Sequence, residues 1–305
     1  LKFPSLWVAL LAPVMSGCSE QQLRVVRHFI LSAPPLEVGE VLKDCEKIVG
    51  APFEAEWLQT VLAEHTEQAL YAVDVEDAKG IICPQARVDG GYLLPSTDTV
   101  FQVDHVEQKV TSTRPVTEDE VGARSRSEPF RSEVQKALKT YLGEHFLGQN
   151  ACCTYGIDNE DGSITIDVVV TALDHSVRNF WSGSWASQWK TTFTPGAGTC
   201  EMKGAVRLGM HYYEDGNVQL RHSKEHSQQL EGVDSEAAFG KAVVAAIRAG
   251  DGKVHSAMEQ LYQRMGDEPL KAMRRVLPVS KEKFDWTPAR HLVAIQLAAG
   301  AQKSE

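Results

Sequence analysis

The chain has 305 residues, with 31 basic and 41 acidic side chains and a formal net charge of -10 at pH 7. Hydrophobic residues make up 43% and charged residues 24%, as in ordinary globular proteins, and no apolar stretch reaches the ~18–20 residues that a membrane-spanning helix needs. The negative charge argues against non-specific nucleic-acid binding, because phosphate affinity comes from clustered cations. Six cysteines without a Cys-x-x-Cys pair predict buried thiols in a reduced cytosolic protein rather than a disulfide framework or a zinc site.

The first 18 residues imitate a short signal peptide. Lys2 precedes the apolar residues 6–12, and small side chains follow up to Cys18. The alternative is an extension that packs against the body of the protein. We favour the extension, because the cysteine pattern gives export no support.

Residues 19–72 predict a layer of three helices. Ser19 and Gln22 have the spacing of a capping box, and the helix that follows ends before two consecutive prolines at 34 and 35. Apolar residues at helical spacing predict a second helix over 36–49 and a third over 55–70.

The region 73–150 mixes strand, loop and helix. Alternating valines predict a strand near 99–109, and the polar residues 111–127 predict a solvated loop. Helical spacing returns over 128–146.

Residues 151–230 predict an antiparallel sheet of consecutive strands. Strands are expected over 163–173, 180–193, 199–213 and 218–224, with turns at 159–162 and 215–216. Such a meander needs only one covered face. We therefore expect one thiol of the vicinal pair Cys152 and Cys153 to lie at a surface or an edge.

A long helix is predicted at 234–265, within a segment 231–277 that has a basic end, and Gly250 and Gly252 are expected to interrupt it. The predicted fold class is α+β: an N-terminal helical layer, an antiparallel meander covered by this helix, and a peripheral tail over 278–305. Apolar residues near Leu292 allow a short amphipathic helix in that tail, which a partner groove would explain.

No motif for catalysis, cofactor binding or metal binding is present, so we expect no enzyme, no cofactor and no metal. His222 and His226 lack a third ligand. Tryptophans 181, 185 and 189 could form a stacking platform for sugars or nucleic acid. We favour packing between sheet and helix and a subunit contact, because their surroundings are neither cationic nor rich in carboxylates.

The segment 271–285 is basic in an otherwise acidic chain, with five Lys or Arg against two acids, Glu282 and Asp285. Lys271, Arg274 and Arg275 have the i, i+3, i+4 spacing of one helix face. Lys281 and Lys283 extend the cations toward Trp286. A solvated charged face is the plain explanation, and a surface for an anionic partner is the functional one.

Two stretches, 270–278 (LKAMRRVLP) and 211–218 (HYYEDGNV), resemble the two signatures of the F-actin capping protein alpha subunit family. Residues 32–35 (SAPP), 279–286 (VSKEKFDW) and the tryptophan block also resemble that family, so the resemblance runs from about 19 to 286. Members form a heterodimer with a similar beta subunit, in which both chains contribute to one continuous antiparallel sheet overlain by a long helix from each. Their C-terminal tentacles bind the barbed end of an actin filament and block subunit gain and loss.

The resemblance implies an actin-binding role for three cations, Lys271, Arg275 and Lys281, and an aromatic anchor at Trp286. Charge alone adds Arg274 and Lys283, and the amphipathic tail adds Leu292. The partners implied are the capping protein beta subunit and the actin barbed end, with phosphoinositides and capping regulators as further family partners, in a cytoplasmic, cytoskeletal protein that is not an enzyme. Beyond Trp286 the tail has fewer basic and large apolar residues than the family pattern.

The alternative function is a scaffold subunit of a larger cytoskeletal assembly that caps an actin-related filament. An exported enzyme ranks third, because the chain lacks any catalytic motif.

Overall fold

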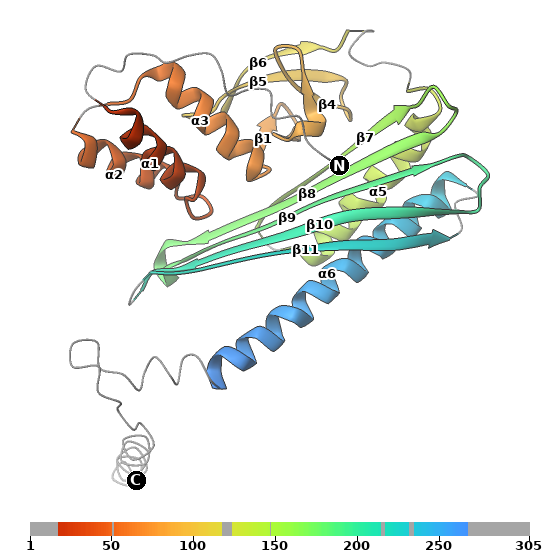
Figure 1. Ribbon diagram of the computed structural model, residues 1–305. Helices are drawn as coiled ribbons and strands as arrows, with labels where there is room; N and C mark the ends of the chain where they lie inside the picture. Colours follow the sequence, from red (N-terminus) through yellow and green to blue (C-terminus); the bar gives the residue numbers. More distant parts are fainter. Residues whose placement is uncertain are drawn as a thin grey trace, which may run out of the picture. The chain divides into compact units, whose positions relative to one another are not determined.

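A computed structural model (Figure 1) describes residues 18–50, 52–117, 124–146, 148–214, 217–231 and 235–267, with side chains up to residue 261. The chain divides into two compact units, Leu1–Arg248 and Ala249–Glu305. The described residues form a mixed fold of helices and antiparallel sheets, which confirms the predicted α+β class. No helix among them is long and apolar enough to cross a membrane.

Three helices begin the fold: α1 (Glu20–Leu31), α2 (Val38–Val49) and α3 (Ala55–Gln68). The predicted capping box is present, because the Gln22 amide donates to Ser19 Oγ and the Ser19 amide donates to Gln22 Oε1. The helices share an apolar core in which Ile30 and Leu62 are almost completely buried.

Six short strands follow and form two small antiparallel sheets. The first sheet pairs β1 (Ala72–Val75) with β2 (Ala78–Ile81). The second has the order β3-β4-β5-β6, and a 3-10 helix, η1 (Pro84–Ala86), precedes it. Its strands are β3 (Arg87–Val88), β4 (Gly91–Leu94), β5 (Thr99–Asp104) and β6 (Lys109–Pro115).

Two predictions for this region are wrong. The strand expected near 99–109 ends at Asp104, and the stretch expected as a loop from 111 belongs to β6 as far as Pro115. β6 is mostly exposed and polar, so its sequence carries no apolar alternation. Its Val and Thr residues still favour extended backbone, because their branched side chains fit a pleated surface.

The large sheet has the order β11-β10-β9-β8-β7, an antiparallel meander in which neighbours in sequence are neighbours in space. Helix α5 (Ser127–His145) precedes it, and η2 (Val177–Asn179) joins β8 to β9. The strands are β7 (Gln149–Asp158), β8 (Ile164–Ser176), β9 (Trp181–Phe193), β10 (Thr199–Tyr212) and β11 (Val218–Glu231).

Both faces of the sheet are covered at its β7 side. On one face, Phe130 of α5 and Phe193 of β9 meet Phe239, near the start of α6 (Glu236–Asp267). On the other face, the small sheets share a core with β7, β8 and β9. The expectation of a surface thiol is therefore wrong: Cys152 and Cys153 are 7% and 2% exposed, because consecutive residues of β7 point into two different cores.

Helix α6 runs unbroken through Gly250 and Gly252, so the predicted interruption is wrong. A glycine inside a helix costs only ~1 kcal/mol relative to alanine, which a long helix tolerates. The packing role predicted for the tryptophans is confirmed for Trp185 and Trp189, which are 7% and 2% exposed. Gly204 of β10 is required beside them, since a Cβ there would lie 2.3 Å from the Trp189 ring.

Candidate dimer interface and basic segment

The predicted actin-binding residues all lie beyond the last described residue, 267. They are Lys271, Arg274, Arg275, Lys281, Lys283, Trp286 and Leu292. The described residues show what precedes this segment in the chain and which surfaces of the first unit remain unpaired.

The start of α6 is firmly fixed within the first unit. Phe239, Val243 and Ile247 are fully buried, at 0% exposure. The ring centroid of Phe239 lies 4.5 Å from that of Phe193. Gly240 allows close approach to α5, because a Cβ there would lie 3.0 Å from the Glu133 carbonyl oxygen. The first part of α6 is therefore packed tightly against α5 and β9.

β11 is one of the two outer strands of the large sheet, and β7 is the other. β11 pairs with β10 along its whole length, from Thr199 opposite Glu231 to Tyr212 opposite Val218, without a bulge. In the described part of the chain, no strand pairs with its other edge. Since the backbone groups of an antiparallel strand point alternately to either side, half of those in β11 face outward without a strand partner.

β11 lacks the backbone features that usually protect an open edge. Natural edge strands are usually short, bulged or interrupted by proline, because an open edge invites pairing with another chain. β11 has 14 residues and none of these devices. Its exposed residues alternate with inward ones, and most are polar: Arg221, Ser223, Glu225, Ser227 and Gln229. A long regular edge of this kind is suited to continue a sheet into a second chain.

Side-chain hydrogen bonds and an ion pair order the surface where β11 lies beside β10. Ser227 Oγ donates to Glu201 Oε1 at 2.7 Å, and Lys203 Nζ lies 2.9 Å from Glu201 Oε2. The hydrogen bonds from Lys203 and Ser227 lower the pKa of the Glu201 carboxyl. These contacts order the side chains without covering the outer edge.

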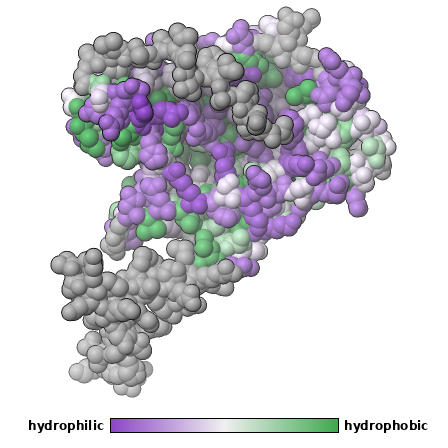
Figure 2. Space-filling view, viewed as in Figure 1, coloured by the Kyte–Doolittle hydropathy of each residue, from purple (hydrophilic) through white to green (hydrophobic). Residues whose placement is uncertain are grey.

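Among the described residues, a second surface without a packing partner lies on the outer face of α1 and α2. Val25 and Phe29 are 48% and 49% exposed, and Ile48 is 80% exposed. They line a groove of about 280 Å³, and Figure 2 shows hydrophobic side chains at the surface of this layer. Clustered exposed apolar side chains of this kind mark a contact surface.

Sequence reasoning missed part of these two exposed surfaces. The last strand was expected over 218–224, but β11 continues to Glu231. The signal was present in the alternation of side chains, because His226 and Leu230 lie on the same face of the strand and both are buried. The exposed residues of α1 and α2 gave no such signal, because an apolar residue at helical spacing looks the same whether its partner is inside the chain or outside.

Known proteins resemble this chain over most of its length. A model of the F-actin capping protein alpha subunit family matches residues 26–295. The F-actin-capping protein subunit alpha of Dictyostelium discoideum is 28% identical over 279 residues, which cover 90% of this chain and 96% of that protein. The corresponding subunit of Arabidopsis thaliana is 29% identical over 288 residues, covering 88% of this chain and 89% of that protein.

A solved structure shares the fold. The homodimeric actin capping protein alpha subunit from Plasmodium berghei matches with a TM-score of 0.67 and 18% identity, covering 78% of this chain and 91% of that chain. The matched family range takes in the helical layer, both small sheets, the large sheet and the basic segment. This chain belongs to the F-actin capping protein alpha subunit family.

Proposed function

We propose that this chain is the alpha subunit of a heterodimeric capping protein, which binds the barbed end of actin filaments and blocks subunit addition and loss without catalysis. The observation that carries the proposal is the range of the family match, because residues 26–295 include every predicted actin-binding residue from Lys271 to Leu292.

The open edge of β11 supports an obligate partner. A capping protein beta subunit would add its own edge strand to β11 and continue the sheet across the dimer. The apolar outer face of α1 and α2 would give the same partner a second contact, so that two unpaired surfaces of the first unit become buried.

The basic segment supplies the contact with the filament. Lys271, Arg275 and Lys281 attract the acidic surface of actin and speed association, since complementary charge acts mainly on the on-rate. Trp286 is the apolar anchor, and burial of an aromatic side chain slows dissociation. In this proposal the protein works in the cytoplasm at the cytoskeleton, and phosphoinositides or capping regulators compete for the same cations.

The test is barbed-end elongation of actin from filament seeds, with this chain co-expressed with a candidate beta subunit. The triple variant Lys271→Ala/Arg275→Ala/Lys281→Ala is expected to lose about 100-fold in capping affinity, because three contacts of ~1 kcal/mol each are removed. The control is Lys109→Ala/Lys136→Ala/Lys190→Ala, which removes the same charge from lysines that are 76%, 79% and 62% exposed and lie outside both proposed contact surfaces. It should cap like the wild type.

A stable dimer that leaves actin elongation unchanged would contradict the proposal and favour the scaffold alternative, in which an actin-related filament is capped. Size measurement of this chain expressed alone decides a second question. The relative from Plasmodium berghei is described as homodimeric, so a stable dimer of this chain alone would replace the beta subunit with a second copy.

A further inference from the structure

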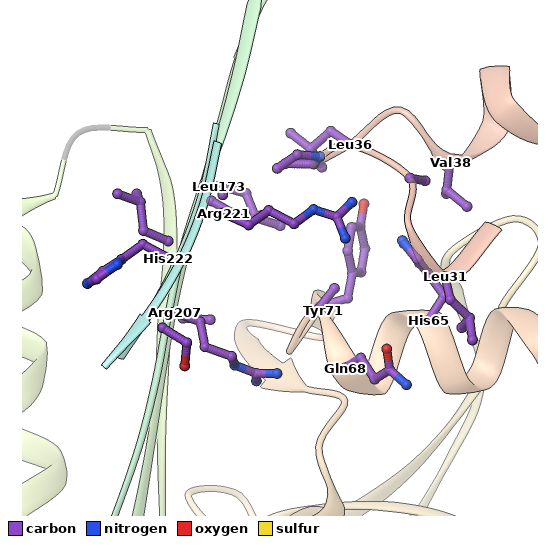
Figure 3. A pocket seen from close by; sticks show the side chains of 18 of the residues that line it. Leu31, Leu36, Val38, His65, Gln68, Tyr71, Leu173, Arg207, Arg221 and His222 are labelled. Atoms are coloured by element: carbon purple, nitrogen blue, oxygen red, sulfur yellow. The ribbon is translucent and has the colours of Figure 1, made fainter. Parts of the chain in front are cut away.

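A cavity of about 350 Å³ lies between the helical layer and the large sheet. We name it the β10–β11 pocket, because Arg207 of β10 and Arg221 of β11 form its sheet side. The loop after α1, the end of α3 and Tyr71 form its other side (Figure 3). Small-molecule sites usually enclose about 300–1,000 Å³, so the volume suits a small ligand.

The strand register places the two arginines on one face. Arg207 lies opposite Ser223, and Arg221 lies opposite Gly209. Since side chains alternate along a strand, both guanidinium groups leave the sheet toward the helical layer, and Figure 3 shows them extending into the cavity. His222 points to the other side of the strands.

No acid balances these two charges. The pocket has no aspartate or glutamate in its lining, and neither arginine forms an ion pair within the described residues. Arg207 donates to the Gln188 side-chain oxygen at 3.5 Å, and Arg221 donates to the Ser32 carbonyl, so both acceptors are neutral. Burial lowers the pKa of Arg207. Arg207 is partly buried without a counter-charge, which is destabilising, and an anion bound beside it would remove that cost, whereas Arg221 is more exposed.

Two other features of the lining are unusual for a plain packing gap. His65 of α3 is 9% exposed, and its Nδ1 has no hydrogen-bond partner, although buried polar atoms nearly always have one. Leu36 has a φ of 62°, in the left-handed region that leucine rarely adopts. Strained backbone of this kind clusters at ligand sites.

We propose that the β10–β11 pocket binds a small organic carboxylate with an apolar body. The carboxylate would lie between the guanidinium groups of Arg207 and Arg221, whose planar donor sets match two carboxylate oxygens. The apolar body would contact Leu36, Val38 and Leu173, which line the remaining walls. The uncharged His65 would offer one further hydrogen bond.

A carboxylate with an apolar body fits this lining better than a phosphate ester. Apolar side chains form most of the wall beside the two arginines, and a phosphate dianion loses more hydration on burial than a carboxylate monoanion. The site is independent of the capping proposal, because every lining residue lies in the first unit and none in the basic segment.

The test measures binding of 3-phenylpropionate to the purified full-length protein by calorimetry, beside its neutral analogue 3-phenylpropanamide and beside phenyl phosphate. We expect the carboxylate to bind at least 10-fold more tightly than either. Equal binding of carboxylate and amide, absence of binding by all three, or preference for phenyl phosphate would each overturn the proposal.

Variants locate the site. Arg207→Gln and Arg221→Gln should each weaken carboxylate binding at least 10-fold, and Arg207→Lys, which keeps the charge, should weaken it less than Arg207→Gln. Arg178→Gln removes one charge from an exposed arginine outside the pocket and should change binding less than twofold. Thermal melting of each variant separates loss of binding from loss of folding. Equal effects of Arg207→Gln and Arg178→Gln in folded protein would place the carboxylate elsewhere.

Discussion

The two edges of the large sheet are built differently. β7 buries the six consecutive residues from Ala151 to Gly156, whereas β11 buries only His226 and Leu230. Tyr155 of β7 belongs to a core shared with Ile81 and Phe101 of the small sheets. β11 has no strand partner on its outer edge within the described residues. Other parts of the chain cover the side chains of β7, whereas most side chains of β11 stay exposed among the described residues.

This difference separates the residues that stabilise the isolated chain from the groups that are available for association. Apolar burial at β7 stabilises the chain on its own, since buried area is the main favourable contribution to folding. The outward backbone groups of β11 contribute little to the isolated chain, because water satisfies them. Substitutions at β7 should therefore change unfolding, and substitutions at the outer edge of β11 should change association.

The largest effect is expected at the covered edge. Tyr155 is 5% exposed, and Tyr155→Ala should lower the free energy of unfolding by about 3–5 kcal/mol, because loss of a buried aromatic ring leaves a cavity. Urea denaturation followed by circular dichroism measures it. Gln219→Ala on exposed β11 is the control, with a change within about 0.5 kcal/mol. Equal losses at the two positions would abolish the contrast between the edges.

Proline substitutions in β11 test the open edge. Gln228 and Gln229 are adjacent, so only one of them donates its amide to β10 and the other points its amide outward. Proline at the position whose amide donates to β10 should destabilise the chain. Proline at the position whose amide points outward should leave the free energy of unfolding unchanged. It should weaken dimerisation by about 10–100-fold, because the outer edge of β11 loses a hydrogen-bond donor. Analytical ultracentrifugation of the two variants measures the effect. If neither substitution changes association, the dimer forms through another surface.

The sequence predicted the elements whose signals are local. The capping box at Ser19 and the consecutive strands of the meander depend on residues close together in the chain, so spacing reveals them. The burial of both Cys152 and Cys153 cannot be predicted from local spacing, because the second layer over β7 comes from residues 70–101. The short strands β1 to β4 have two to four residues each, too few for a period to show.

The same distinction applies to the sites. The basic segment is visible as a run of charges, but its structure lies outside the described residues. Arg207 and Arg221 could be placed on one face of the hairpin by counting back from the turn predicted at 215–216, since a hairpin fixes the register. Their position opposite His65 and Tyr71 could not, because packing of the helical layer on the sheet is set by tertiary contacts.

Acid should weaken the packing of the helical layer on the sheet at His65 of α3. Burial, and then the charge of Arg221, lowers the pKa of His65 from 6.5 to about 4. The unfolded chain therefore takes up a proton below pH 6.5 that the folded chain resists, so stability is lost as the pH falls. The loss should reach about 2 kcal/mol at pH 5 relative to pH 7. In the β7 core, burial raises the pKa of Cys83 to about 11, which adds no acid sensitivity.

Urea denaturation at pH 7 and pH 5 measures this dependence of the free energy of unfolding on pH, called the slope below. His65→Asn should remove most of the loss on acidification, because the titrating group is gone. The control is His28→Asn, at an exposed histidine of α1, which should keep the wild-type slope. An unchanged slope in the His65 variant would assign the acid sensitivity to other groups.

The smallest effect is expected at the loop between α1 and α2, where hydrogen bonds of Glu37 connect the helical layer to β9 and β10. Glu37 Oε1 accepts hydrogen bonds from Ser182 Oγ at 2.7 Å and from His211 Nδ1 at 2.8 Å. Glu37→Gln keeps an acceptor but removes its charge, so the free energy of unfolding should fall by about 1 kcal/mol, because charge-assisted bonds are about twice as strong as neutral ones. Glu40→Gln is the matched control: its partner Lys43 and its own carboxylate are 64% and 75% exposed, and exposed pairs contribute at most about 1 kcal/mol and often nothing measurable. If Glu40→Gln cost as much as Glu37→Gln in urea denaturation, the loop bonds would have no special role, and the helical layer would be held over β10 and β11 by apolar packing alone.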